Sequence, residues 1–412
     1  MIKTAAADIR MGKFDNLQIS KEGVVRRFYI LLTALLVAPL LLCLVAREPA
    51  PLSTAALAQA QQPVDNRNAP RLSVEVVQDF LKYPPNLNLG EVLGVAVNSK
   101  GEIVVLNHPG SPTTGPLYGN ATTQILVFDR NGKFVREIGQ GVYGLGYSHA
   151  VRFDKYDNLW VVDKGTNAVT KFNPAGYVTM NLGRRPEGYE GEYHRPEPAK
   201  AVAVDGLFNA PTDIGWDGED NIYVSDGYIN SRIAKMDKNG NWIRSWGAYG
   251  EGGEHANENP GHFRNPHNMQ IDRQGHIYAA DRGNRRIQVF DKDGTFLRFM
   301  FLNVPYDKSR HPVLGNLPMN RPDETAPWTL CITTNGPTQY LFAADSEPGR
   351  LYKMTLDGRI LGWFGESGRQ WGQFNWPHGL ACPSENELYV ADLNNWRVQK
   401  LVIRPAGATS SR

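Results

Sequence analysis

The sequence has few cysteines and almost no net charge. Its 412 residues include 3 Cys, so one disulfide between Cys331 and Cys382 is possible, but a domain of this size does not depend on it. Because 44 Lys+Arg oppose 42 Asp+Glu, no basic surface for nucleic acid is expected. Apolar residues make up 41% of the chain, enough for a folded core, which excludes wholesale disorder.

Turn-forming and aromatic residues are plentiful instead. The chain has 41 Gly, 27 Pro, 9 Trp, 17 Tyr and 16 Phe. Aromatic residues favour strands, whereas Gly and Pro favour tight turns. This composition predicts many short strands rather than long helices.

The N-terminal region is set apart by one long apolar run. Residues 28–46 carry no charge and are long enough to span a bilayer, and the basic segment 1–27 precedes them. We expect residues 1–27 to lie in the cytoplasm and the chain after residue 46 to be exported to the periplasmic or extracytoplasmic face of the membrane. A signal anchor and a cleaved signal peptide both remain open. Residues 47–70, rich in Ala, Gln and Pro, are predicted to be a flexible linker.

Residues 71–405 carry an internal repeat. Six times, a short apolar strand ends in Asn or Asp and is followed by a second strand and a Gly-containing hairpin turn. The strand ends, 47 to 64 residues apart, are Asn107, Asp163, Asp226, Asp281, Asp345 and Asp392. Six such sheets stacked radially predict an all-β, six-bladed β-propeller. The segment 72–77 is expected to complete the last blade, and 406–412 to be a disordered tail.

Three histidines share one position in alternate repeats. His149, His267 and His378 each precede a strand-end aspartate by fourteen residues. Alternate blades of a six-bladed ring are related by about 120°, so the three imidazoles should point at one spot on the channel axis. Three His with an open fourth position are typical of catalytic zinc. The alternative is that each histidine only hydrogen-bonds a loop carbonyl.

Two further side chains are predicted near this axis. Tyr228 lies in the run SDGYINSR after the third strand end, and Arg282 lies in ADRGNRR one repeat later. Nearby cations stabilise the negative charge of a phenolate, which makes Tyr228 a candidate proton acceptor and Arg282 its electrostatic partner. The alternative is that both runs are ordinary blade turns.

Residues from about 90 to 403 resemble the peptidyl-α-hydroxyglycine α-amidating lyases, which are NHL-repeat propellers. The resemblance rests on three collinear pairs of motifs: PTDIGWD with VSDGYINSRI, NPHNMQID with AADRGNRRIQVF, and WPHGLAC with YVADLNNW. It implies that His149, His267 and His378 bind catalytic zinc, that Tyr228 is the base and that Arg282 lies in the site. The implied reaction cleaves a carbinolamide C–N bond of a small-molecule or peptide substrate to an amide and glyoxylate. We expect a monomer whose only membrane contact is the N-terminal segment.

Two positions depart from the family pattern. His108 stands where the family has a site arginine, which leaves the substrate open. Gly379 stands where the family has an aspartate that binds a structural calcium, which argues against that calcium. The alternative function is a non-catalytic NHL propeller that binds a ligand or protein in the cell envelope. A lactonase-like hydrolase ranks last, because no matching set of acidic ligands is present.

Overall fold

The computed structural model describes residues 64–109, 123–142, 144–183, 197–250, 259–307 and 325–404. The predicted segments 1–27, 28–46 and 406–412 lie outside them, as does most of the predicted linker 47–70. Within the described residues, no helix is long and apolar enough to span a membrane.

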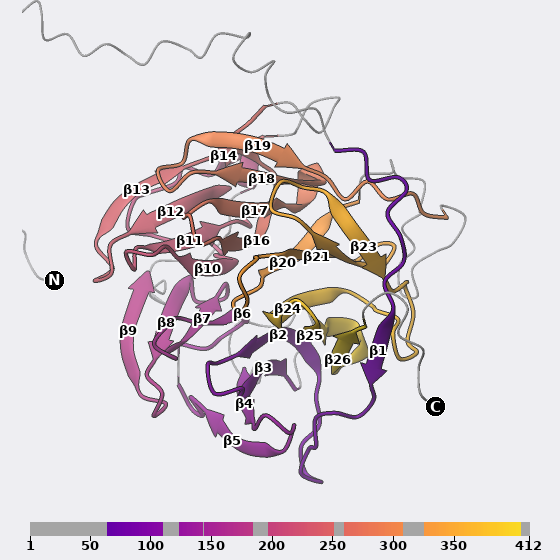
Figure 1. The fold of residues 1–412 in the computed structure, drawn as a ribbon. Helices are drawn as coiled ribbons and strands as arrows, with labels where there is room; N and C mark the ends of the chain where they lie inside the picture. Colours follow the sequence, from indigo (N-terminus) through magenta and orange to yellow (C-terminus); the bar gives the residue numbers. More distant parts are fainter. Residues whose placement is uncertain are drawn as a thin grey trace, which may run out of the picture. The chain divides into compact units, whose positions relative to one another are not determined.

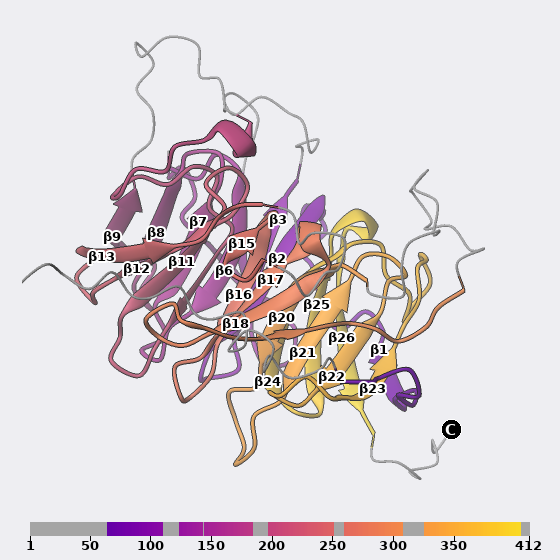
Figure 2. The ribbon, with the colours of Figure 1, turned by 90° about the horizontal axis from the view of Figure 1, so that it is seen from above.

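The described residues form six four-stranded antiparallel sheets, which confirms the all-β, six-bladed propeller (Figures 1 and 2). Blades one to three are β2 (Glu91–Val97), β3 (Ile103–His108), β4 (Gln124–Phe128), β5 (Phe134–Ile138); β6 (Ser148–Phe153), β7 (Leu159–Asp163), β8 (Ala168–Phe172), β9 (Val178–Gly183); and β10 (Asp213–Trp216), β11 (Ile222–Asp226), β12 (Arg232–Met236), β13 (Trp242–Trp246). Blades four to six are β16 (Pro266–Ile271), β17 (Ile277–Asp281), β18 (Arg286–Phe290), β19 (Phe296–Met300); β20 (Pro327–Ile332), β21 (Leu341–Asp345), β22 (Leu351–Met354), β23 (Ile360–Phe364); and β24 (Pro377–Ser384), β25 (Glu387–Asp392), β26 (Arg397–Ile403), β1 (Val74–Val77).

A few short elements accompany the blades. They are the two-stranded parallel sheet of β14 (Ala248–Tyr249) and β15 (His262–Phe263), and the 3-10 turns η1 (Pro198–Lys200), η2 (Arg282–Asn284) and η3 (Leu393–Asn395). The turns η2 and η3 directly follow the second strands of blades four and six. They therefore lie where a blade meets the rim of the channel.

Strand β1 closes the ring as predicted. It pairs antiparallel with β26 in the register Val74 to Ile403, so the first and last strands share blade six (Figure 1). The end of the predicted linker is part of this closure. Asn66 is buried and donates to the Asn303 side chain and to the Gly358 carbonyl of blade five. Residues 64–70 therefore pack against the propeller rather than behaving as tether.

Six hydrophobic clusters hold the blades together, one at each interface between neighbours. Between blades two and three, for example, Trp160 and Val162 pack with Ile214 and Val224. Each sheet thus buries both faces against its neighbours, which a single four-stranded sheet cannot do alone. This packing fixes the angular spacing of the innermost strands.

The strand-end aspartates that mark the repeat are buried structural groups. Asp163 is fully buried and accepts hydrogen bonds from the Tyr147 and Thr166 backbone amides and from the Ser148 hydroxyl. It therefore ties the start of its own inner strand to the turn after the second strand. Because the same aspartate recurs in blades two to six, and Asn107 takes its place in blade one, each blade presents these two segments together at one end of the channel.

Candidate metal centre

Each of the three histidines lies in a β-bulge at the start of an innermost strand. In β6, Ser148 pairs with Asp163 and Ala150 with Val162, so His149 is the extra residue between them. His267 in β16 and His378 in β24 occupy the same extra position in their own strands. A bulge redirects the side chain of its extra residue. Here the three imidazoles turn toward one another, with ring centroids 4.6 to 4.9 Å apart.

The odd-numbered blades orient these rings. The Nδ1 atom of His149 lies 2.7 Å from the Thr212 carbonyl oxygen of blade three. The Nδ1 of His267 lies 2.8 Å from the carbonyl of Trp328, and that of His378 lies 2.7 Å from the carbonyl of Leu93. A carbonyl oxygen only accepts hydrogen bonds, so each Nδ1 carries the proton and each Nε2 presents a lone pair.

The lone pairs of the three rings converge. One ring nitrogen of each histidine lies within 4.8 Å of those of the other two, and the Nε2 atoms of His149 and His267 are 3.2 Å apart. Two tetrahedral zinc ligands with Zn–N bonds of about 2.0–2.1 Å would be separated by about 3.3 Å. Each imidazole therefore hydrogen-bonds a carbonyl through Nδ1 and also presents Nε2 to the shared point. The two interpretations of these histidines are compatible.

Burial keeps these imidazoles neutral. The side chains of His149, His267 and His378 are almost completely buried, and burial lowers the pKa of all three, that of His378 to about 3. The charges of Lys164 and Arg282 lower the pKa values of His149 and His378 further. Facing lone pairs of neutral rings repel one another unless a cation lies between them. The donor set and its protonation state thus fit a zinc ion.

Tyr228 reaches the same point from blade three. Its hydroxyl lies 3.2 Å from Nε2 of both His149 and His267. The preceding Gly227 makes this approach possible: a Cβ there would lie 2.0 Å from the Pro266 carbonyl oxygen, so no larger residue fits. Tyr228 is thereby placed beside the open side of the histidine triad.

Two cations flank the Tyr228 ring. The Arg282 guanidinium lies 5.8 Å from its centroid and 4.2 Å from that of Trp328, and the Lys164 ammonium lies 4.6 Å from the Tyr228 centroid. Both side chains are half-buried. Such a pair can hold an anionic group of a ligand at the mouth of the triad.

The side chain of His108, the remaining predicted site residue, forms no hydrogen bond with the triad or with Tyr228. It ends β3, is buried, and packs edge-on against Tyr147 with ring centroids 4.5 Å apart. Burial, and secondarily the charge of Lys164, lowers its pKa to about 3. Neither ring nitrogen forms a well-formed hydrogen bond with a described residue, although the Ser148 backbone approaches closely enough to oppose the pKa shift slightly. In the structure, His108 is therefore a neutral, buried side chain that packs beside the site.

Lys164 is the site residue that sequence reasoning missed. It directly follows the strand end Asp163, as Arg282 follows Asp281 and His108 follows Asn107. Comparing the position after each strand end across the repeats would have found it. Two of the three carbonyls that orient the histidines could have been found in the same way, because Leu93 and Thr212 stand at the histidine register of their own repeats.

Comparison with known proteins agrees with this architecture. The NHL repeat matches residues 263–290. The chain is 29% identical over 331 residues to peptidyl-glycine alpha-amidating monooxygenase B of Xenopus laevis, covering 74% of this chain and 33% of that protein. It is 26% identical over 338 residues to peptidyl-alpha-hydroxyglycine alpha-amidating lyase 1 of Drosophila melanogaster, covering 77% and 58%. This chain thus spans a third to rather more than half of these relatives.

Among solved structures, an auxiliary nutrient binding protein from Bacteroides ovatus aligns with a TM-score of 0.52 at 13% identity, over 81% of this chain and 78% of that one. That likeness supports the fold alone. Fold and repeat together define an NHL-repeat β-propeller. Within that class the chain resembles the amidating lyases, as its motifs predicted.

Proposed function

We propose that this protein is an exported, zinc-dependent lyase that cleaves the C–N bond of a carbinolamide to give an amide and glyoxylate. The observation that carries the proposal is the convergence of three neutral histidines on one point that the Tyr228 hydroxyl also reaches. Structural zinc sites close all four positions with protein ligands, whereas three histidines leave one position for substrate. A zinc ion held by His149, His267 and His378 would supply Lewis-acid polarisation of the substrate hydroxyl.

The chain's own residues account for the remaining proton movements. Tyr228 accepts the proton of the substrate hydroxyl, and Lys164 and Arg282 beside its ring stabilise the negative charge of its phenolate. The electron pair of the oxygen then forms the C=O bond of glyoxylate while the C–N bond breaks. Tyr228 returns the proton to the departing nitrogen, which leaves as the amide, so atoms and charge balance. The same two cations would hold the substrate's carboxylate.

We also propose that the propeller lies outside the cytoplasm. The Cys331–Cys382 disulfide supports this placement, because such bonds persist in oxidising compartments. The apolar run 28–46 supplies the means of export, as anchor or as signal peptide. We propose a monomer that acts on a small molecule or a peptide supplied by another protein.

A glyoxylate assay tests the reaction. The zinc-loaded full-length protein is incubated with a peptide ending in α-hydroxyglycine, and glyoxylate is measured against the uncatalysed background. We expect Tyr228→Phe to lower kcat by about 10²- to 10⁴-fold with the zinc content unchanged. The exposed Tyr177→Phe is the matched control and should leave kcat unchanged. A folded, zinc-containing protein that releases no glyoxylate would refute the lyase and favour the ligand-binding propeller.

A further inference from the structure

A buried ion pair lies in the channel just beyond the histidines. The Arg152 guanidinium donates to both carboxylate oxygens of Asp213, with distances of 3.0 Å from Nε and 2.8 Å from Nη2. Its remaining nitrogen, Nη1, donates to the Leu380 carbonyl at 3.2 Å. The Asp213 side chain is fully buried and that of Arg152 is 14% exposed. A bidentate pair of this kind has a fixed geometry.

This ion pair connects all three strands that carry the histidines. Arg152 follows His149 by three residues in β6, and Leu380 follows His378 by two in β24. The third strand, β16, joins through Met269, whose backbone amide donates to Asp213 Oδ2 at 3.0 Å.

Asp213 is also next to Thr212, whose carbonyl accepts the hydrogen bond from His149. One charged pair therefore sets the spacing of the three strands and of one orienting carbonyl.

The calcium that the family resemblance implies does not fit here. Its aspartate ligand would stand at Gly379, where a Cβ would lie 2.9 Å from the Gly94 Cα and 3.0 Å from the Leu93 carbonyl oxygen. Backbone atoms this close cannot give way cheaply, so position 379 has no room for a carboxylate. The Leu380 carbonyl, the next oxygen along the strand, already accepts from Arg152.

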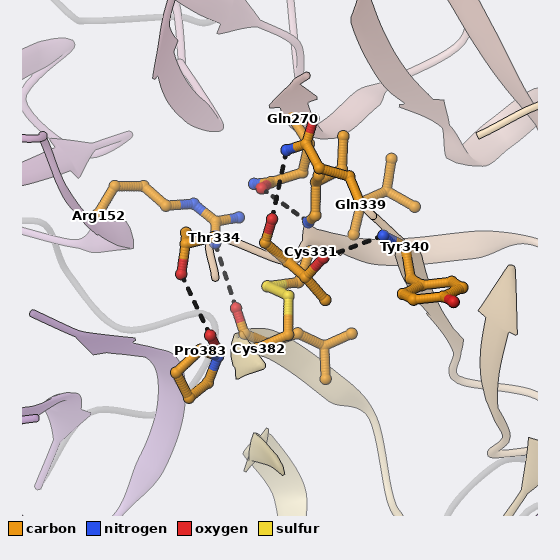
Figure 3. Close-up of a disulfide and its surroundings, with 12 residues drawn as sticks. Arg152, Gln270, Cys331, Thr334, Gln339, Tyr340, Cys382 and Pro383 are labelled. Atoms are coloured by element: carbon orange, nitrogen blue, oxygen red, sulfur yellow. Dashed lines mark hydrogen bonds between the residues drawn. A yellow bond between two sulfur atoms is a disulfide. The ribbon is translucent and has the colours of Figure 1, made fainter. Parts of the chain in front are cut away.

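Little space separates the triad from the ion pair. The cavity between them, lined by His149, His378, Arg152 and Gly379, measures about 10 Å³. Such a volume holds at most about one water molecule. Arg152 also lies beside the Cys331–Cys382 disulfide, which joins β20 to β24, as Figure 3 shows.

We propose that Arg152 and Asp213 are positioning residues for the metal centre, and that their ion pair takes the structural place of a second metal ion. The guanidinium supplies the fixed positive charge. Its three hydrogen bonds, together with the one that Asp213 accepts from Met269, hold the strands of the histidine ligands at the spacing zinc requires. The inference rests on the zinc site of the proposed function. It adds that zinc binding needs Arg152 and does not need calcium.

Zinc affinity measured by chelator competition tests the proposal on the full-length protein. We expect Arg152→Met to weaken zinc binding by about tenfold to a hundredfold, as the loss of supporting contacts around metal ligands does. The visible spectrum of the cobalt-substituted protein should change as well, because the ligand geometry relaxes. Asp213→Asn keeps an oxygen acceptor for Met269 and for Arg152, so it should lose less zinc affinity than Arg152→Met. It provides a second variant if Arg152→Met folds poorly.

Arg397→Met is the matched control. Its guanidinium pairs with buried Asp392 of blade six and is 18% exposed, and it also donates to carbonyls of the loop before that blade. We expect lower stability with zinc affinity within about twofold of the wild type, since surrounding contacts rather than stability set affinity.

Three results would overturn the inference. They are an unchanged zinc affinity in folded Arg152→Met, an equal loss in Arg397→Met, or a wild type that binds zinc only when calcium is added. A wild type that binds zinc without releasing glyoxylate would refute the lyase while leaving this inference standing.

Discussion

The burial of His108 makes the stability of the propeller depend on pH. Its pKa falls from 6.5 to about 3 in the folded protein. As pH drops below 6.5 the unfolded chain takes up a proton that the folded chain refuses, so folding stability is complete above pH 6.5 and is lost on acidification. Each pKa unit corresponds to about 1.36 kcal/mol, so His108 alone should cost about 2 kcal/mol between pH 7.5 and pH 5.

Urea unfolding at a series of pH values checks this expectation. Wild type is compared with His108→Asn and His108→Leu, all with chelator present so that metal does not contribute. The two replacements differ in baseline stability because they pack differently, but neither titrates. Both should therefore gain about 2 kcal/mol relative to wild type on going from pH 7.5 to pH 5. Parallel stability curves for all three proteins would refute the reasoning, since His108 would then titrate normally while folded.

Two further predictions concern Lys164 and the disulfide. Lys164→Met should lower kcat/KM by about tenfold or more for a substrate with a free carboxylate, since a hydrogen bond to a charged group contributes about 1.5–3 kcal/mol. On the corresponding methyl ester the loss should be smaller by about that factor, since only the contribution of Lys164 to the Tyr228 phenolate is then removed, and equal losses on both substrates would contradict a carboxylate contact. The Cys331→Ser, Cys382→Ser double variant opens a covalent loop of 51 residues. It should lower the free energy of unfolding by about 4 kcal/mol in the chain-entropy account, and an unchanged urea midpoint would contradict that account.

Periodicity predicted most of the fold because the repeat constrains each blade locally. Asp163 and its equivalents mark the end of every second strand, and the turns between strands carry Asn, Asp or Gly at fixed places. The alternation in 72–77 was enough to predict the closing strand. The end of the linker was not predicted, because the partners that hold Asn66 are distant in sequence: Asn303 follows the last strand of blade four and Gly358 lies in blade five.

The candidate site, too, could be predicted from the sequence only in part. Equal register placed His149, His267 and His378 at one point, and local motifs placed Tyr228 and Arg282 beside them. What the sequence did not reveal depends on contacts between blades.

Two such contacts matter most. The carbonyl that fixes each imidazole belongs to a neighbouring blade, as Thr212 does for His149. Arg152 meets Asp213, 61 residues away, only once blades two and three have packed together.

Metal content tests the central claim most directly. The full-length protein is purified without added metal, and bound zinc is measured by elemental analysis alongside His267→Ala, with His276→Ala at the blade turn as control. We predict about one zinc per chain in the wild type and in the control, and loss of zinc in His267→Ala. A well-folded wild type without bound metal, which also takes up none when zinc is supplied, would contradict the three-histidine centre and the zinc-dependent lyase built on it.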